Sequence, residues 1–236
     1  MRTYKNFVAG ILGGLLIVFT LQSAYAEHPR VILVTGFEPF GGDSTNSSWE
    51  AVRNFDGKHF NNATVVVAQL PVVWGKAAEK LHELTKTHKP VAVISFGQAG
   101  EGPVLLETTA HNVRENIQDN KKMLPQTLQV YSHATPALKT MLPLPEIEAR
   151  LRAEGIPVRL SQDAGTYLCN DIFYTLMYDP GTNDTKEIPR GFVHVPPLNA
   201  NVRTKVGDTV IFDKILLQKT AELIIQTVAD TLSQNQ

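Results

Sequence analysis

The chain has 236 residues, of which 43% are hydrophobic and 19% are charged, values typical of a folded globular protein and unlike those of a disordered chain. Its formal net charge is −1, so no overall field attracts nucleic acid or an anionic membrane surface. The length fits one α/β domain, and the sequence contains no low-complexity tract or internal repeat.

The N-terminus has the pattern of a signal peptide. A basic start precedes an apolar stretch over 7–21, which ends at the small-x-small sequence A-Y-A at 24–26. A transmembrane anchor is the weaker interpretation, because the stretch is shorter than the ~20 apolar residues of a membrane span. We therefore expect residues 1–26 to be removed on export to a periplasm or to the outside of the cell. The remaining single domain, 27–236, would then have no stable membrane anchor.

After this leader, apolar segments alternate with amphipathic ones. Runs rich in β-branched residues predict buried strands, and apolar residues at helical spacing predict helices. In chain order we expect a strand over 30–36, a short helix that is capped by Ser47 or Ser48 and runs through 54, and strands over 64–70 and 90–96 flanking a helix over 74–87. After these we expect a strand near 109–113, a helix over 144–154, a strand over 158–161, a helix over 168–178, a strand over 191–195 and a helix over 214–232. This alternation predicts a three-layer α/β/α sandwich with a mostly parallel twisted sheet.

In such sheets, ligands bind at the carboxyl ends of the strands, so we expect the segments directly after residues 35, 94, 160 and 193 to meet at one edge of the sheet. The first predicted strand leads into the loop G-F-E-P-F-G-G, which carries Phe37 and Phe40. Two aromatic side chains on a loop either line an apolar site or complete the core, and this segment supports both interpretations equally. The sequence has no phosphate-loop lysine or dinucleotide G-x-G-x-x-G motif, which disfavours a nucleotide site.

Cys169 is the only cysteine in the chain, so an internal disulfide cannot explain it. It follows the strand over 158–161 and the turn Ala164-Gly165, and it lies in the first turn of the helix predicted from 168. The N–H groups and dipole at a helix N-terminus stabilise a thiolate and can bind a developing oxyanion. A buried, inert cysteine is the common alternative, but this position favours a nucleophile.

His194 lies at the end of the last predicted strand, in the apolar segment F-V-H-V-P-P. A histidine there is usually a core residue, yet beside a thiol nucleophile it is the candidate general base. A third group has to orient the imidazole, and spacing alone does not choose between Glu101, Glu107 and Glu115. A metal centre is disfavoured, because Glu107 and His111 lack the partners of an H-E-x-x-H or C-x-x-C motif.

Together these segments resemble the pyroglutamyl peptidase I family of cysteine peptidases, also called pyrrolidone-carboxylate peptidases. The resemblance covers the chain from residue 31 to the C-terminal helix and implies a single α/β/α sandwich. Five motifs occur in the family's order: G-F-E-P-F-G-G with N-S-S-W at 46–49, G-Q-A-G at 97–100, L-E-T-T-A-H-N from 106, S-Q-D-A-G-T-Y-L-C-N from 161 and F-V-H-V-P-P-L from 192.

The resemblance implies a role for each candidate residue. Cys169 is the nucleophile, His194 is the general base and Glu107 completes the triad. Phe37 and Phe40 are the two residues that sandwich the pyrrolidone ring of the substrate. The implied activity is the removal of N-terminal pyroglutamate from peptides, without a metal ion or organic cofactor. The partners would be such peptides and not nucleic acid, and a homo-oligomer is one option for the assembly.

The chain departs from many bacterial relatives, which read G-Q-A-G-G-R and E-R-x-A-x-N. Glu101-Gly102 and Thr108 stand at these motifs here, so two arginines are missing, and Arg114 is a candidate to replace their charge. The leader is a further addition, because the family is typically cytosolic. The alternative function is an exported protein of the same fold that binds pyroglutamyl groups with lost or weak turnover.

Overall fold

The computed structural model describes residues 30–178, 188–204 and 207–234, so the predicted signal peptide lies outside it. Its helices are α1 (Ser47–Val52), the 3₁₀ helix η1 (Arg53–Phe55), α2 (Lys76–His88), α3 (Leu144–Ala153), α4 (Leu168–Tyr178) and α5 (Lys214–Gln234). Its strands are β1 (Arg30–Phe37), β2 (His59–Phe60), β3 (Ala63–Leu70), β4 (Ala92–Gln98), β5 (Val104–Glu107), β6 (Thr109–His111), β7 (Ala137–Lys139), β8 (Val158–Ser161), β9 (Arg190–Val195), β10 (Ala200–Arg203) and β11 (Thr209–Phe212). None of the described helices is both long and apolar enough to cross a membrane.

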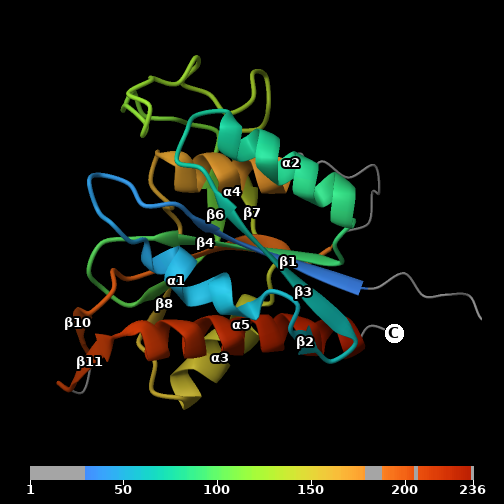
Figure 1. Ribbon diagram of the computed structural model, residues 1–236, viewed down its shortest axis with the longest axis vertical. Helices are drawn as coiled ribbons and strands as arrows, with labels where there is room; N and C mark the ends of the chain where they lie inside the picture. Colours follow the sequence, from blue (N-terminus) through green and yellow to red (C-terminus); the bar gives the residue numbers. More distant parts are fainter. Residues whose placement is uncertain (1–29, 179–187, 205–206, 235–236) are drawn as a thin grey trace, which may run out of the picture.

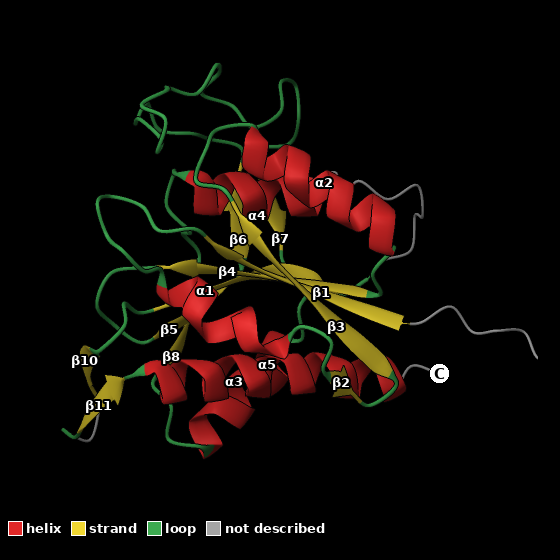
Figure 2. Cartoon of the chain, viewed as in Figure 1, coloured by secondary structure: helices red, strands yellow, loops and turns green. Residues whose placement is uncertain are grey.

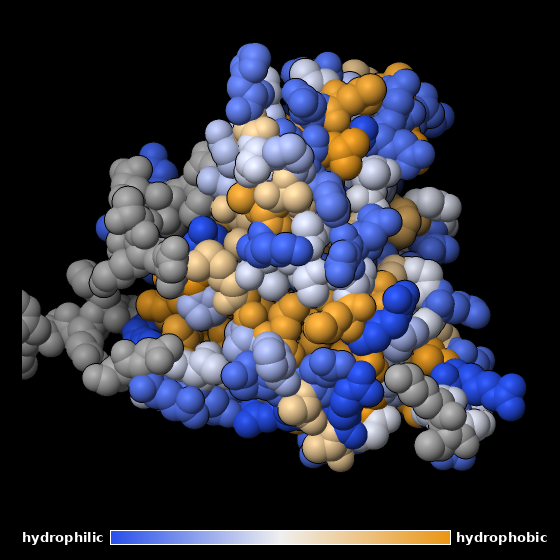
Figure 3. All heavy atoms as spheres, turned by 180° about the vertical axis from the view of Figure 1, so that it is seen from behind, coloured by the Kyte–Doolittle hydropathy of each residue, from blue (hydrophilic) through white to orange (hydrophobic). Residues whose placement is uncertain are grey.

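The described elements form the predicted three layers. A seven-stranded sheet lies between α2 and α4 on one face and α1, α3 and α5 on the other (Figures 1 and 2). Side chains alternate along each strand, so Ile32 of β1 packs toward α5 whereas Leu33 packs toward α4. Viewed from behind, apolar atoms form a band across the middle of the molecule, at the height of the sheet (Figure 3). The predicted α/β/α sandwich is confirmed.

The sheet is mixed in strand direction. Its order is β2-β3-β1-β4-β9-β5-β8, and β3, β1, β4 and β9 are parallel to one another. By contrast, β5 is antiparallel to β9 and parallel to β8. The expectation that β8 ends at the same edge as β1, β4 and β9 is therefore wrong. Residues 162–167 instead lead the chain from β8 to the start of α4.

The carboxyl end of β1 is shaped by its contact with α1. A Cβ on Gly36 would lie 2.9 Å from the Ser48 carbonyl oxygen, so only glycine allows the helix to come this close. The side chain of Asn46 caps α1 by accepting the Ser48 N–H at 3.0 Å. The expected cap was Ser47 or Ser48, but the helix begins at Ser47. This arrangement holds the loop with Phe40 beside the end of the sheet.

A long connection over 112–136 joins β6 to β7 and contains no helix or strand. It runs past α4 and α2 at the top of the view in Figure 2. Hydrogen bonds from side chains hold it in place: Asn112 donates to the Tyr131 carbonyl oxygen at 2.7 Å, and Asp119 accepts the Trp74 N–H at 2.9 Å. Connections of this length without regular structure are uncommon in compact domains and are often functional.

Candidate active site

Cys169 is the second residue of α4 and is half-buried. The turn before it forms because Gly165 adopts a φ of 77° and donates its N–H to Oδ1 of Asp163 at 2.9 Å. The first N–H groups of a helix have no acceptor within the helix. They therefore provide a favourable environment for negative charge on or near the cysteine sulfur.

His194 and Glu107 come from neighbouring strands. In the antiparallel pair β9–β5, His194 lies opposite Leu105, so Glu107, two residues further along β5, shares its face of the sheet. Nδ1 of His194 lies 2.8 Å from Oε1 of Glu107, and both side chains are buried. The other carboxylate oxygen, Oε2, has no hydrogen-bond partner among the described residues. The carboxylate therefore fixes the orientation of the imidazole.

The cysteine sulfur lies against the strand next to His194. Gly97 of β4 pairs with His194, and a Cβ on Gly97 would lie 2.9 Å from Sγ of Cys169 and 2.7 Å from the ring of Phe192. A side chain at this position would displace the sulfur. The absence of one leaves room for the sulfur beside β4, next to the strand that carries His194.

The pKa of His194 is raised from its ordinary value of 6.5 to about 10. Burial disfavours the imidazolium and lowers the pKa, but the electrostatic and hydrogen-bonding contributions of Cys169 and Glu107 together outweigh it. The site therefore favours the protonated form of the His194 imidazole. Such a group can protonate a leaving amine at neutral pH.

A pocket of about 250 Å³ opens beside the cysteine. Its lining is mostly apolar and consists of Phe37, Phe40, Asn46, Val72, Gln98, Tyr167, Leu168 and Cys169. Both predicted ring-binding residues line the pocket, but they differ in burial. Phe37 is buried at the end of β1, whereas Phe40 is half-buried on the loop that follows.

Two polar side chains of the lining are held by hydrogen bonds. Oε1 of Gln98 accepts the Ser47 N–H at 2.7 Å, which leaves the NH₂ group of the glutamine as a donor. The Nδ2 group of Asn46 donates to the Glu38 carbonyl oxygen at 3.0 Å. The pocket thus combines apolar walls with a small number of fixed polar groups, as ligand sites commonly do.

Sequence reasoning assigned no role to several of these residues. Gln98 and Asn46 belong to the motifs G-Q-A-G and N-S-S-W, so motif membership was the available signal. Gly97 belongs to the first of these motifs as well. Tyr167 precedes the cysteine by two residues and belongs to the motif S-Q-D-A-G-T-Y-L-C-N, so the same signal was available for it. Its place in the pocket depends on how α4 begins.

The residues at the positions of the two missing arginines do not line the pocket. Glu101 is exposed, and Thr108 Oγ1 donates to the Ser161 carbonyl oxygen at 2.9 Å. Arg114 does not line the pocket. Its guanidinium instead pairs with Asp171 of α4 at 2.6 Å. His111, also considered in the sequence, contacts the Gln162 carbonyl oxygen at 2.9 Å through Nε2.

The family model described as pyroglutamyl peptidase matches residues 30–228. The chain belongs to this family. A pyrrolidone-carboxylate peptidase of Cupriavidus pinatubonensis is 36% identical over 206 residues, which cover 86% of this chain and 94% of that protein. Another from Bacillus mycoides is 37% identical over 203 residues, covering 85% of this chain and 94% of the relative.

Solved structures give the same result. The crystal structure of pyroglutamyl peptidase I from Bacillus amyloliquefaciens has a TM-score of 0.76 and 33% identity, and the match covers 85% of this chain and 97% of that one. Pyrrolidone carboxyl peptidase from Thermococcus litoralis has a TM-score of 0.78 and 31% identity, with 88% and 96% of the two chains covered. The predicted family is confirmed on sequence and on fold.

Proposed function

We propose that the protein is a cysteine peptidase that removes pyroglutamate (5-oxoproline) from the N-terminus of peptides. Its membership of the pyroglutamyl peptidase family supports this reaction. The observation that carries the proposal is the position of Cys169 between the buried His194–Glu107 pair and a small apolar pocket. This geometry supplies a nucleophile, a proton carrier and a place for the acyl group of the substrate.

The reaction proceeds through a thioester. The Cys169 thiolate attacks the carbonyl carbon of the pyroglutamyl amide, and a C–S bond forms. The imidazolium of His194 gives its proton to the leaving amine as the C–N bond breaks. The neutral imidazole then takes a proton from water, whose oxygen attacks the thioester. Pyroglutamate and the thiolate are released, and the imidazolium is restored.

Two further groups assist these steps. Glu107 accepts a hydrogen bond from the Nδ1–H of His194, which leaves Nε2 as the nitrogen that exchanges protons with the reacting atoms. Backbone N–H groups in the first turn of α4 are the donors for the tetrahedral oxyanion, because they lie next to the nucleophile.

Specificity comes from the pocket. Phe37 and Phe40 pack against the two faces of the lactam ring, and Asn46 and Gln98 offer hydrogen-bonding groups for its polar edge. A site built to pair a polar edge discriminates strongly against rings that lack it, because its own groups would be left unpaired. Prolyl amides, which lack the ring carbonyl, are therefore expected to be poor substrates.

A fluorogenic amide of pyroglutamate tests the proposal directly. Wild-type protein should release the fluorophore and should accept the matching prolyl amide poorly. Cys169→Ser should fold normally and lose nearly all turnover, because a serine hydroxyl is a far weaker nucleophile at neutral pH than an activated thiolate. Iodoacetamide should inactivate the wild type and label Cys169 once per chain. Wild-type turnover in the serine variant would contradict the mechanism.

The same experiment addresses the alternative of a binding protein. In that case neither form would hydrolyse the amide, yet both would bind pyroglutamate. Release of the fluorophore in the presence of EDTA further distinguishes a cysteine peptidase from a metalloenzyme.

We also propose that the protein is exported after removal of residues 1–26. The basic start, the apolar stretch and the A-Y-A sequence support this. The family match begins only at residue 30, which agrees with a leader added to the peptidase domain. N-terminal sequencing of protein from its native host should begin at or near Glu27. An intact Met1 on cytosolic protein would contradict export. The homo-oligomer stays a prediction.

A further inference from the structure

The first turn of α4 carries two buried polar side chains directly after the nucleophile. Cys169 is half-buried, whereas Asn170 and Asp171 are completely inaccessible to solvent. Burying an amide or a carboxylate costs free energy unless its hydrogen bonds are replaced. The hydrogen-bond partners of these two side chains therefore show which segment the first turn of α4 is attached to.

Asn170 binds the backbone at the end of β6. Its Oδ1 accepts the His111 N–H at 2.9 Å, and its Nδ2 donates to the carbonyl oxygens of His111 at 2.8 Å and Val113 at 2.9 Å. One side-chain amide thus makes three hydrogen bonds to a segment far away in the sequence. Such a contact allows very little movement of this residue relative to β6.

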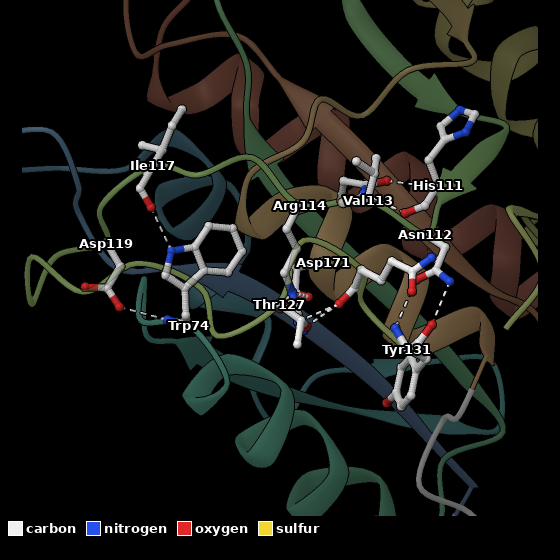
Figure 4. A network of polar contacts seen from close by, with 12 residues as sticks. Trp74, His111, Asn112, Val113, Arg114, Ile117, Asp119, Thr127, Tyr131 and Asp171 are labelled. Carbon is white, nitrogen blue, oxygen red and sulfur yellow. Dashed lines mark hydrogen bonds and ion pairs between the residues drawn. The ribbon is translucent and has the colours of Figure 1, made fainter. Parts of the chain in front are cut away.

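Asp171 binds the same segment through an ion pair. Its Oδ1 accepts from Nε of Arg114 at 2.6 Å. The Nη1 group of Arg114 in turn donates to Thr127 Oγ1 at 3.1 Å and to the Gln129 carbonyl oxygen at 2.9 Å. Figure 4 shows the Arg114 side chain reaching Asp171 and Thr127, with the indole of Trp74 at its flank. The arginine therefore joins the long connection to the nucleophile helix.

The ion pair is not explained by stability alone. Burial raises the pKa of Asp171, and this effect exceeds the lowering by the charge and hydrogen bond of Arg114. A raised carboxyl pKa means that the ionised form costs the folded state free energy, and this cost grows as the pH rises. In addition, Oδ2 of Asp171 has no hydrogen-bond partner among the described residues. Buried ion pairs can often be replaced by apolar residues without loss of stability.

The contacts of Asn170 and Asp171 also restrict the rotation of α4 about its own axis. Successive residues are rotated by about 100° around the axis, so Cys169, Asn170 and Asp171 point in three different directions. Two of these directions are fixed to residues 111–114. The first turn of α4 therefore cannot rotate without breaking the hydrogen bonds of Asn170 and Asp171, and the direction of the third side chain, Cys169, is set as well.

The chain just before the helix is held to the same segment at Thr166. The Glu115 N–H donates to the Thr166 carbonyl oxygen at 2.8 Å, and Thr166 Oγ1 donates to Oε2 of Glu115 at 2.7 Å. The long connection thus contacts the chain on both sides of Cys169.

We propose that Asn170 and the Arg114–Asp171 pair are positioning residues, which fix the rotation of the first turn of α4 and so direct the Cys169 sulfur toward His194. The inference rests on the proposed function, because it takes Cys169 as the nucleophile. It also gives Arg114 a role different from the one considered in the sequence. The arginine acts through Asp171 and does not supply charge at the pocket.

Arg114→Met tests the proposal, because methionine keeps much of the apolar stem and removes the charge and the donors. A displacement of about 1 Å in a catalytic group can lower the rate about 100-fold. We expect kcat for the pyroglutamyl amide to fall about 10- to 100-fold, with KM changed by less than about twofold, because the pocket walls remain. The rate of Cys169 alkylation by iodoacetamide should fall as well, since the misdirected sulfur loses its contact with the imidazolium. Arg114→Lys, which keeps the charge, should recover part of both rates.

Arg150→Met is the matched control. Arg150 of α3 pairs with Asp230 of α5 at 2.7 Å on the opposite face of the sheet, so the same substitution breaks an ion pair away from the site. Its kcat and alkylation rate should equal those of the wild type.

Wild-type kcat and alkylation in folded Arg114→Met, with only its thermal stability reduced, would overturn the proposal. If that variant does not fold, Asp171→Asn is measured in its place, because it removes the charge and keeps the shape. A lower kcat at unchanged KM then supports positioning, and wild-type rates overturn it. Alkylation needs no substrate. If wild-type protein fails to hydrolyse pyroglutamyl amides, the proposed function fails, while slower alkylation in the variants still supports positioning of the thiol.

Discussion

The buried polar groups of α5 and those of the candidate site, on opposite faces of the central sheet, are satisfied in different ways. On the face covered by α5, Thr220 and Thr227 donate to carbonyl oxygens four residues earlier in their own helix. On the face covered by α4, Glu107 bonds to a residue 87 positions away, and Asp171 to one 57 positions away. The two threonines of α5 are satisfied within their own helix, whereas Glu107 and Asp171 require distant segments to be in place.

This difference suggests that one face mainly stabilises the fold and the other mainly determines turnover. The α5 face is packed mainly with aliphatic side chains, which stabilise the fold through burial in many equivalent contacts. The α4 face contains the candidate triad, where a small displacement changes the chemistry. Substitutions on the two faces should therefore separate turnover from stability. The following variants are ordered by their expected effect on turnover.

Glu107→Gln should have the largest effect. The amide has nearly the same shape, but its NH₂ group can face Nδ1 of His194 and favour the wrong tautomer. We expect kcat to fall by about 100-fold or more, with little change in the temperature of unfolding. Steady-state kinetics with a pyroglutamyl amide measures this effect. A variant with wild-type kcat would remove Glu107 from the triad.

The pH profile of the same variant gives a second measurement. The pKa of His194, about 10 in the folded protein, lies above the ordinary 6.5. The imidazolium therefore contributes stability that is complete below about pH 6.5 and is lost as the pH rises toward 10. Wild-type kcat should persist through neutral pH and fall on the alkaline side. Because Glu107 helps to raise this pKa, Glu107→Gln should move the alkaline limb to lower pH. An unmoved limb would show that the carboxylate does not act on His194.

Gly97→Ala should lower kcat by roughly 10- to 100-fold. The added methyl group would lie 2.9 Å from Sγ of Cys169, so the sulfur or the Phe192 ring has to shift. Gly100→Ala is the matched control, because a Cβ there meets no atom within 4 Å. Both variants are assayed for kcat and for alkylation of Cys169. Equal rates in the two would mean that the sulfur has room to adjust.

The two pocket phenylalanines should differ, because only one belongs to the core. Phe40→Ala removes a half-buried pocket wall and should raise KM about tenfold at similar kcat, within the 1–3 kcal/mol range of pocket contacts. Phe37 is 2% exposed and its ring centroid lies 6.4 Å from that of Phe192. Phe37→Ala should therefore also destabilise the fold by about 3–5 kcal/mol. Unchanged kcat/KM in both variants would exclude these residues from the site.

The layers of this fold follow from local patterns, and the direction of β5 does not. Helices such as α2 and α5 repeat apolar residues at helical spacing, and β1 is a continuous β-branched run, so each is recognisable by itself. The segment over 104–107 was not assigned as a strand. Its reversed direction had one available signal: only residues 99–103 separate it from β4, and a parallel crossover needs a dozen residues or more.

The same pairing explains why Glu107 could not be selected from spacing. The carboxylate reaches His194 only because β5 inserts beside β9, and no periodicity in the sequence encodes that pairing. The nucleophile was easier to identify, because its signal is local: a lone cysteine after a glycine turn at a helix start. The Arg114–Asp171 pair had no local signal, since residues 112–136 lack any repeating pattern. Their structure depends on side-chain contacts with α2 and α4.

Ile224→Ala should have the smallest effect on turnover. Ile224 is completely buried between α5 and the sheet, on the face opposite the candidate triad. Removing its side chain should cost about 2–5 kcal/mol of unfolding free energy, measurable by denaturant titration and by a lower Tm. Assayed well below that Tm, the folded variant should keep the wild-type kcat and KM, because Ile224 packs on the face of the sheet opposite the pocket and the triad. A fall in kcat in the fully folded variant would mean that packing on the α5 face also controls the position of β9 and His194. The two faces would then be coupled through the sheet, and stability and turnover could not be changed separately.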